Sequence, residues 1–187
     1  MSTEPEFVPF PKIARWSREV IVTEKVDGTN ALILISDDGT EILAGSRSRW
    51  ITPQSDNFGF ARWVEVNKVE LLRLGPGIHA GEWFGAGIQR TYGLKEKRFS
   101  LFNTHRWGDA STRPACCGVV PVLYQGNLDV MNIHSIMFDL EVKGSLAVPG
   151  WMKPEGVVIF HTASGVLFKK TVDRDYAPKG KTSIVGQ

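Results

Sequence analysis

Short runs rich in isoleucine, valine and leucine recur along the chain and are separated by residues that favour turns. The clearest pair covers 30–36 and 40–46, because Asp37-Asp38-Gly39 between them is a strong signal for a tight hairpin turn. Similar runs predict strands over 19–24, 78–84, 98–103, 119–124, 156–161 and 165–170, and the last two are predicted to form a hairpin through Ala163-Ser164-Gly165. We therefore expect a chain built on mostly antiparallel sheets.

Two longer stretches have apolar residues near helical spacing. The first covers 57–74 and is closed by Gly75-Pro76-Gly77; the second covers 128–142 and is ended by Gly144. Strands interspersed with two helices predict an α+β fold, with mostly antiparallel sheets and flanking helices.

Length and composition indicate one ordinary globular domain. The 187 residues are 42% hydrophobic and 22% charged, and no apolar run approaches the length of a membrane helix. We expect a single domain over 1–187, with an irregular lead-in at about 1–18 and a loose tail at about 177–187. The acidic, proline-containing N-terminus is no signal peptide, and the adjacent cysteines, Cys116 and Cys117, fit a reducing cytosol. We therefore expect a cytoplasmic protein with no membrane partner.

The segment Lys25-Val26-Asp27-Gly28 connects two of the apolar runs. A protonated lysine is a poor nucleophile, but partial desolvation or a nearby cation lowers a lysine's pKa, and the free amine can then attack phosphorus. A glycine lets a phosphate or sugar come close to the backbone. The spacing suggests a lysine that carries a nucleotide covalently. The alternative is a plain hairpin turn with a solvated lysine, because Asp-Gly is a common turn dipeptide.

Further charged and aromatic residues follow in order along the other apolar runs. They occur in Ser46-Arg47-Ser48-Arg49, Gly81-Glu82-Trp83-Phe84-Gly85, Phe99-Ser100-Leu101-Phe102-Asn103, Glu155-Gly156-Val157-Val158 and Phe168-Lys169-Lys170. Charges beside buried strands tend to meet each other or a ligand, because burying them alone is costly. Two carboxylates with several cations suit nucleotidyl transfer, in which cations stabilise phosphates and carboxylates bind a metal or ribose hydroxyls.

This ordered series resembles the covalent nucleotidyltransferase superfamily of DNA ligases, RNA ligases and mRNA capping enzymes. Within it, Glu24-Lys25-x-x-Gly28-Thr29-Asn30 is most similar to RNA ligases of the editing type and their compact phage and bacterial relatives. The resemblance runs from about residue 20 to about residue 172. It implies the adenylation-domain fold of these enzymes.

The resemblance also implies roles for the nucleotide-binding residues. Lys25 would form the covalent lysyl-AMP, and Glu24 would contact the exocyclic amine of adenine. Glu82 would bind a ribose hydroxyl. Phe102 would stack on adenine, with Phe99 as the alternative.

The remaining roles concern phosphates, metal and nucleic acid. Lys169 would contact the α-phosphate, with Lys170 as a second nucleotide-binding candidate, and Glu155 would help to bind Mg²⁺ or Mn²⁺. Arg47 would hold the ribose or the acceptor 5′-phosphate through its bidentate fork. Asn30 would assist the later steps on the nucleic acid. Arg49 is a nucleic-acid candidate whose alternative is an exposed sheet edge.

The sequence departs from the family pattern at several places. Asp27 stands where editing-type ligases often carry histidine, and Asn103 stands where aspartate is common. In the last motif Leu167 replaces the first of two lysines that are usually separated by one residue. We also expect no C-terminal domain within this chain, and a partner protein that supplies one would compensate.

The resemblance therefore implies an ATP-dependent ligase that uses Mg²⁺ or Mn²⁺ and acts on RNA with a 5′-phosphate and a 3′-hydroxyl. Two alternatives stay open. One is a DNA ligase or another nucleotidyltransferase of the same superfamily. The other is a non-catalytic module that binds nucleotide or nucleic acid. A net charge of +2 requires a local basic patch for a nucleic-acid partner.

Overall fold

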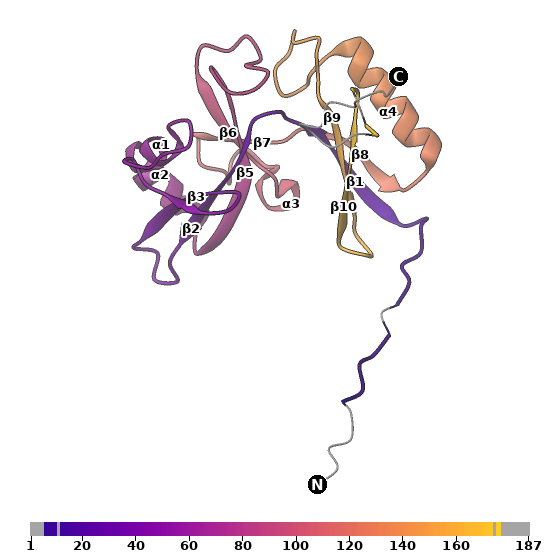
Figure 1. The fold of residues 1–187 in the computed structure, drawn as a ribbon, viewed down its shortest axis with the longest axis horizontal. Helices are drawn as coiled ribbons and strands as arrows, with labels where there is room; N and C mark the ends of the chain where they lie inside the picture. Colours follow the sequence, from indigo (N-terminus) through magenta and orange to yellow (C-terminus); the bar gives the residue numbers. More distant parts are fainter. Residues whose placement is uncertain (1–5, 11, 174, 177–187) are drawn as a thin grey trace, which may run out of the picture.

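A computed structural model of the chain describes residues 6–10, 12–173 and 175–176, and the loose tail predicted at 177–187 lies outside them. Within the described residues the fold is α+β and consists of two sheets (Figure 1). The four-stranded sheet has the order β10-β9-β1-β8, and the six-stranded sheet has the order β4-β3-β2-β5-β6-β7.

The four-stranded sheet is antiparallel throughout. Its strands are β1 (Glu19–Lys25), β8 (Val122–Asn127), β9 (Gly156–His161) and β10 (Val166–Thr171). The hairpin predicted at the C-terminal end is present, since β9 and β10 pair from His161↔Val166 to Gly156↔Thr171. Helix α4 (Val130–Lys143) packs on this sheet through Ile133, Met137 and Leu140.

The six-stranded sheet carries the larger core. Its strands are β2 (Thr29–Ile35), β3 (Ile42–Ser46), β4 (Trp50–Ile51), β5 (Gly77–Gly85), β6 (Lys97–Leu101) and β7 (Cys117–Val119). The hairpin predicted around Asp37-Asp38-Gly39 is confirmed, since β2 and β3 pair antiparallel. Only β6 and β7 pair in parallel among the described strands.

The helical stretch predicted at 57–74 is divided into three short pieces. They are α1 (Phe60–Val66), α2 (Lys68–Leu71) and a 3₁₀ turn, η1 (Leu72–Leu74). Asn67 separates the first two, with its side chain donating to the Trp63 carbonyl at 2.8 Å. Asparagine favours such local hydrogen bonds over continued helix, which explains the break. A short helix α3 (Thr104–Trp107) follows β6.

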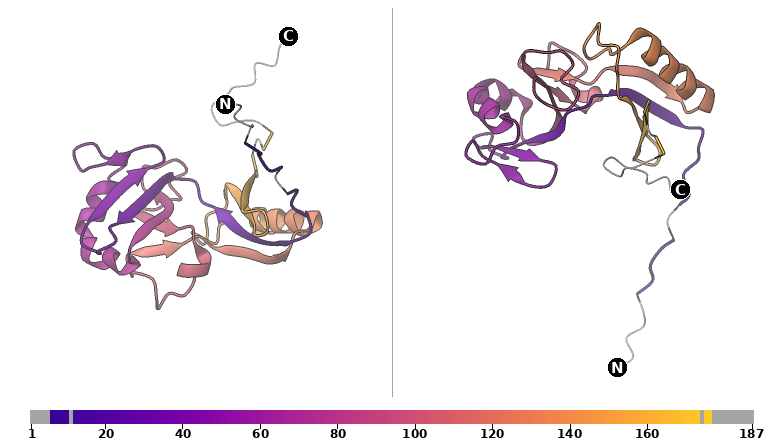
Figure 2. Two further views of the ribbon diagram at one scale, coloured as in Figure 1. Left: turned by 90° about the horizontal axis from the view of Figure 1, so that it is seen from below. Right: turned by 45° about the horizontal axis from the view of Figure 1, so that its top comes forward.

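The predicted strand at 119–124 is also two strands, which lie in different sheets. Val119 ends β7, Val122 begins β8, and Pro121 between them has no N–H to donate to a ladder. The chain therefore passes from one sheet to the other here. It also does so between β1 and β2, whose connection is the Lys25–Gly28 segment (Figure 2).

No helix within the described residues is long and apolar enough to cross a membrane.

Candidate active site

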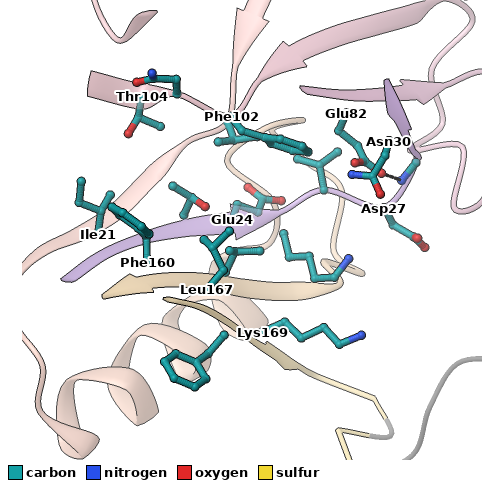
Figure 3. Close-up of a pocket in the computed structure, with 18 of the residues that line it drawn as sticks. Ile21, Glu24, Asp27, Asn30, Glu82, Phe102, Thr104, Phe160, Leu167 and Lys169 are labelled. Carbon is teal, nitrogen blue, oxygen red and sulfur yellow. Dashed lines mark hydrogen bonds between the residues drawn. The ribbon is translucent and has the colours of Figure 1, made fainter. Parts of the chain in front are cut away.

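A cleft of about 1050 Å³ lies between the two sheets, and most residues singled out in the sequence line it. Figure 3 shows Phe102 on one side of β1 and Leu167 and Lys169 on the other. Asp27, Asn30 and Glu82 lie toward one end of the cleft, and Ile21 and Phe160 lie toward the other. The cleft therefore has a polar end and an apolar end.

Lys25 lies at the polar end and is paired with a buried carboxylate. Its Nζ is 2.7 Å from Glu155 Oε2, and the two side chains are 21% and 2% exposed. The alternative of a solvated lysine in a plain hairpin does not describe this structure, because β1 and β2 belong to different sheets. The register explains the pairing, because Lys25 lies opposite Gly156, the residue after Glu155.

Gly28 permits a close contact between the β1–β2 connection and β5 at this point. A Cβ atom added there would lie 2.3 Å from the Trp83 carbonyl oxygen and 2.7 Å from Phe84 Cβ. Its N–H instead donates to Glu82 Oε1 at 2.9 Å. The Lys25–Gly28 turn is thus fixed to β9 at one end and to β5 at the other.

Glu82 is buried at the polar end of the cleft. Burial raises the pKa of its carboxyl to about 7, although the Gly28 N–H and the Lys25 charge act in the opposite direction. The nearby carboxylates of Glu155 and Asp27 add to the increase. A carboxyl with such a pKa changes charge near neutral pH and is typical of functional sites.

Glu24 is 1% exposed and is held by a loop that follows α4. Its carboxylate accepts hydrogen bonds from the Ser145 hydroxyl and from the N–H groups of Leu146 and Ala147, the latter two at 2.8 Å. Glu24 also lines the cleft. These bonds orient the carboxylate, and its contact with an adenine amine stays a prediction.

The structure separates the two aromatic candidates. Phe102 is 41% exposed and lines the cleft, whereas Phe99 is fully buried in the core of the larger sheet against Phe60 and Trp63. Of these two residues, Phe102 is the one with a ring available to a ligand in the cleft.

The two adjacent lysines of β10 are separated in the same way. Leu167, Phe168 and Lys169 all line the cleft, whereas Lys170 does not. Lys170 instead pairs with Asp175, with 3.4 Å between Nζ and Oδ2.

The remaining candidates lie at the cleft's rim or outside it. Arg47 and Asn30 are exposed and line the cleft. Arg49 is not among the lining residues; its guanidinium donates to the backbone oxygen and the hydroxyl of Ser55, both at 3.1 Å.

A family model for RNA ligase matches residues 18–171. The chain belongs to the RNA ligase family. A search of curated proteins finds no match. Several solved structures of Naegleria gruberi RNA ligase have a similar fold. One variant with ATP and Mn has a TM-score of 0.64 and 22% identity, over 84% of this chain and 51% of that chain. An apo variant has a TM-score of 0.62 and 21% identity, over 83% and 50% of the two chains. This RNA ligase family member thus spans about half the length of those proteins.

Some residues around the cleft of this RNA ligase family member carry no sequence signal. Gln89 lines the cleft from the irregular segment between β5 and β6, and Arg90 beside it pairs with Asp27 at 3.0 Å. Tyr92 of the same segment accepts the Asp27 N–H at 2.7 Å. No periodicity or motif marks this loop, and a long-range ion pair leaves no local pattern. Arg90 could be recognised as a site residue only once its partner Asp27 was known.

A divalent metal fits this site only in company with a ligand. Among the described residues, no three His, Cys, Asp or Glu side chains are grouped closely enough to hold a metal ion. Mg²⁺ is commonly bound by one or two carboxylates together with substrate phosphates. Glu155, the candidate metal ligand, is buried against Lys25 and is not itself among the residues that line the cleft, and its metal role stays a prediction.

Proposed function

We propose that the chain is an ATP-dependent RNA ligase that works through a covalent lysyl-AMP. The observation that carries the proposal is the position of Lys25. Its amine reaches the polar end of a cleft that is large enough for a nucleotide, next to Glu155 and Glu82, and Lys169 lines the same cleft from β10. A nucleophile, two carboxylates and a further cation around one cavity are the groups that nucleotidyl transfer requires.

In the first step Lys25 Nζ would attack the α-phosphorus of ATP. A P–N bond forms, the P–O bond to the β-phosphate breaks, and pyrophosphate leaves. Lys25 must separate from Glu155 and give up a proton to solvent, which reaches its partly exposed side chain, before it can attack, because an ammonium group has no free electron pair. Lys169 lies on β10, which is separated from β1 by β9 in the same sheet, and would stabilise the charge that grows on the phosphate oxygens.

The rest of the nucleotide would lie along the cleft. Phe102 offers an exposed ring for stacking on adenine, and Glu82 would accept a hydrogen bond from a ribose hydroxyl. Glu24 would meet the adenine edge. Mg²⁺ or Mn²⁺, held by Glu155 and the phosphates, would neutralise phosphate charge.

In the later steps the AMP would pass to a 5′-phosphate end of RNA. A 3′-hydroxyl would then attack that phosphate, join the strands and release AMP. Arg47 and Asn30, at the exposed rim, are placed to meet the nucleic acid. Arg is suited to the 5′-phosphate because its planar fork binds two oxygens at once. RNA would be distinguished from DNA through its A-form shape and its 2′-hydroxyls near the break.

The first test is covalent labelling. The purified chain is mixed with ATP labelled at the α-phosphate and with Mg²⁺, then denatured. We expect label to stay on the protein at one AMP per chain, and mass spectrometry to place it on Lys25. Lys25→Ala should lose the label. Lys143→Ala, which removes an exposed lysine from α4, is the matched control and should keep it. Equal labelling of Lys25→Ala would refute the assignment.

The second test concerns the substrate. Two nicked duplexes are compared that differ only in ribose or deoxyribose on the 3′-hydroxyl side of the break. We expect faster sealing with ribose. Equal rates, or faster sealing with deoxyribose, would remove the RNA assignment and leave a ligase of another specificity.

A further inference from the structure

Arg90 joins three separate segments around the cleft. Its Nε lies 3.0 Å from Asp27 Oδ2, one terminal nitrogen donates to the Lys153 carbonyl at 3.1 Å, and the other lies 3.6 Å from Asp173 Oδ2. The Arg90 side chain is 26% exposed and the Asp27 side chain 8%, so that pair is largely removed from water.

Each of these partners is close in sequence to a residue of the candidate site. Asp27 follows Lys25 by two residues, and Lys153 precedes Glu155 by two. Asp173 comes just after β10, the strand that carries Lys169. One guanidinium therefore contacts the three segments that hold the nucleophile, the buried carboxylate and the cleft's lysine.

The loop that presents Arg90 has an unusual backbone. Gln89, Thr91 and Tyr92 have φ angles of 44°, 56° and 55°, in the left-handed region that side chains rarely occupy. For the β-branched Thr91 this conformation is particularly unfavourable. Such conformations persist where the surroundings determine them, and they cluster at functional sites.

Tyr92 adds a second anchor from the same loop. Its hydroxyl oxygen accepts the Asp27 N–H at 2.7 Å, while Arg90 binds the Asp27 carboxylate. The loop thus holds both the backbone and the side chain of the residue between Val26 and Gly28. A second link runs between the other two segments, because the Val172 N–H donates to the Glu155 carbonyl at 2.9 Å.

We propose that Arg90 is a positioning residue that keeps Lys25, Glu155 and Lys169 in a fixed mutual arrangement. The inference rests on the proposed function for its catalytic consequence, but the anchoring itself does not depend on it. Arginine is required because its rigid fork reaches three partners in different directions. A lysine ammonium on a flexible stem would keep the charge and lose that geometry.

The kinetic test compares Arg90→Met and Arg90→Lys with the wild-type chain in single-turnover adenylation. Two quantities are measured separately: the fraction of protein that can be adenylated, and the rate constant of that fraction at saturating ATP. We expect the rate constant of both variants to fall by about tenfold to a hundredfold, because small misplacements of reacting groups have effects of that size. The active fraction and the dissociation constant of ATP should change by less than about threefold. Arg98→Gln, which removes an exposed arginine paired with Glu96, is the matched control and should keep the wild-type rate.

A role in stability alone would lower the active fraction and leave the rate constant unchanged, and that result would overturn the proposal. Wild-type behaviour of Arg90→Lys would also overturn it, because charge without the fork would then suffice. A cycle with Asp27→Asn tests the route of action. If Arg90 acts through Asp27, the double variant should be little slower than the slower single variant.

Hydrogen exchange measures the anchoring without any reaction. In Arg90→Met we expect faster exchange of backbone amides in residues 25–28, 153–156 and 171–172, and unchanged exchange in α4. Unchanged exchange in all three segments would overturn the proposal even if the wild-type chain formed no AMP adduct. Absence of that adduct in the wild-type chain, with faster exchange in the variant, would refute the proposed function and leave the anchoring supported.

Discussion

Replacing Glu82 by glutamine should make the fold more stable at alkaline pH and should flatten the dependence of stability on pH. Glu82 is 8% exposed, and burial raises the pKa of its carboxyl to about 7. Glutamine has nearly the same shape and keeps an oxygen that can accept the Gly28 N–H. It carries no charge at any pH, so the substitution removes the ionisation and little else.

The direction of this change in stability with pH follows from proton binding. A raised pKa means that the folded chain holds the Glu82 proton more tightly than the unfolded chain does. The corresponding stabilisation is fully present below the ordinary glutamate pKa of 4.5 and is lost as the pH rises through about 7. The difference between these values, at about 1.4 kcal/mol for each pH unit, corresponds to about 3 kcal/mol.

Urea unfolding of both proteins from pH 4.5 to 8.5 measures this difference. The two proteins share all other titrating groups. Subtracting the free energy of unfolding of wild type from that of Glu82→Gln therefore isolates the contribution of Glu82 ionisation. We expect this difference to rise by about 3 kcal/mol across the range, which for a urea slope of about 2 kcal/mol/M moves the relative midpoints by about 1.5 M. Parallel curves would refute the reasoning, because they would mean that Glu82 titrates equally in the folded and unfolded chains.

Three further predictions follow from the site. Lys169→Ala should slow adenylation by about a hundredfold, as loss of one preorganised charge typically does. Lys170→Ala should slow it by less than about threefold, because Lys170 pairs with Asp175 outside the cleft. Single-turnover labelling measures both rates. Gly28→Ala should lower the free energy of unfolding in urea by about 1–3 kcal/mol, because the added Cβ would overlap the Trp83 carbonyl. An unchanged urea midpoint would show that the turn can shift to accept the Cβ. In the proposed reaction, RNA sealing should fall steeply between about 50 and about 200 mM salt, because phosphate contacts release counterions. A flat salt profile would argue against phosphate contacts by Arg47 at the cleft's rim.

Local sequence was sufficient to predict an element when the element that it pairs with is close in the chain. The hairpin around Asp37-Asp38-Gly39 and the hairpin between β9 and β10 both follow from turn residues between two apolar runs. Helix α4 is limited by Asp129, whose side chain accepts the Met131 N–H, and by Gly144, whose φ is 81°. These boundaries depend on single residues, which makes them readable from sequence.

Sequence was insufficient to predict the features that depend on contacts between residues far apart in the chain. The runs that become β1 and β2 are both strand-like, but nothing within them states that they belong to different sheets. The division of the 119–124 run between two sheets has the same cause. Residue order indicated that Lys25 and Glu155 belong to one site, but their direct ion pair across 130 residues is set by the register of β1 on β9. Arg90 lies in an irregular loop, and its role is visible only from its partners.

The position of the candidate site at the junction of the sheets has a physical consequence. Lys25 is held to the four-stranded sheet through Glu155, and Gly28, three residues later, is held to the six-stranded sheet through Glu82. A nucleotide that stacked on Phe102 and reached Lys169 would also contact both sheets, because Phe102 follows β6 and Lys169 lies on β10. The separation of the sheets therefore sets where a base stacked on Phe102 would leave the phosphate relative to Lys25 and Lys169, which both belong to the four-stranded sheet. Because the Lys25–Gly28 segment is short and fixed at both ends, binding energy gained at the base can be used to place the phosphate against the amine.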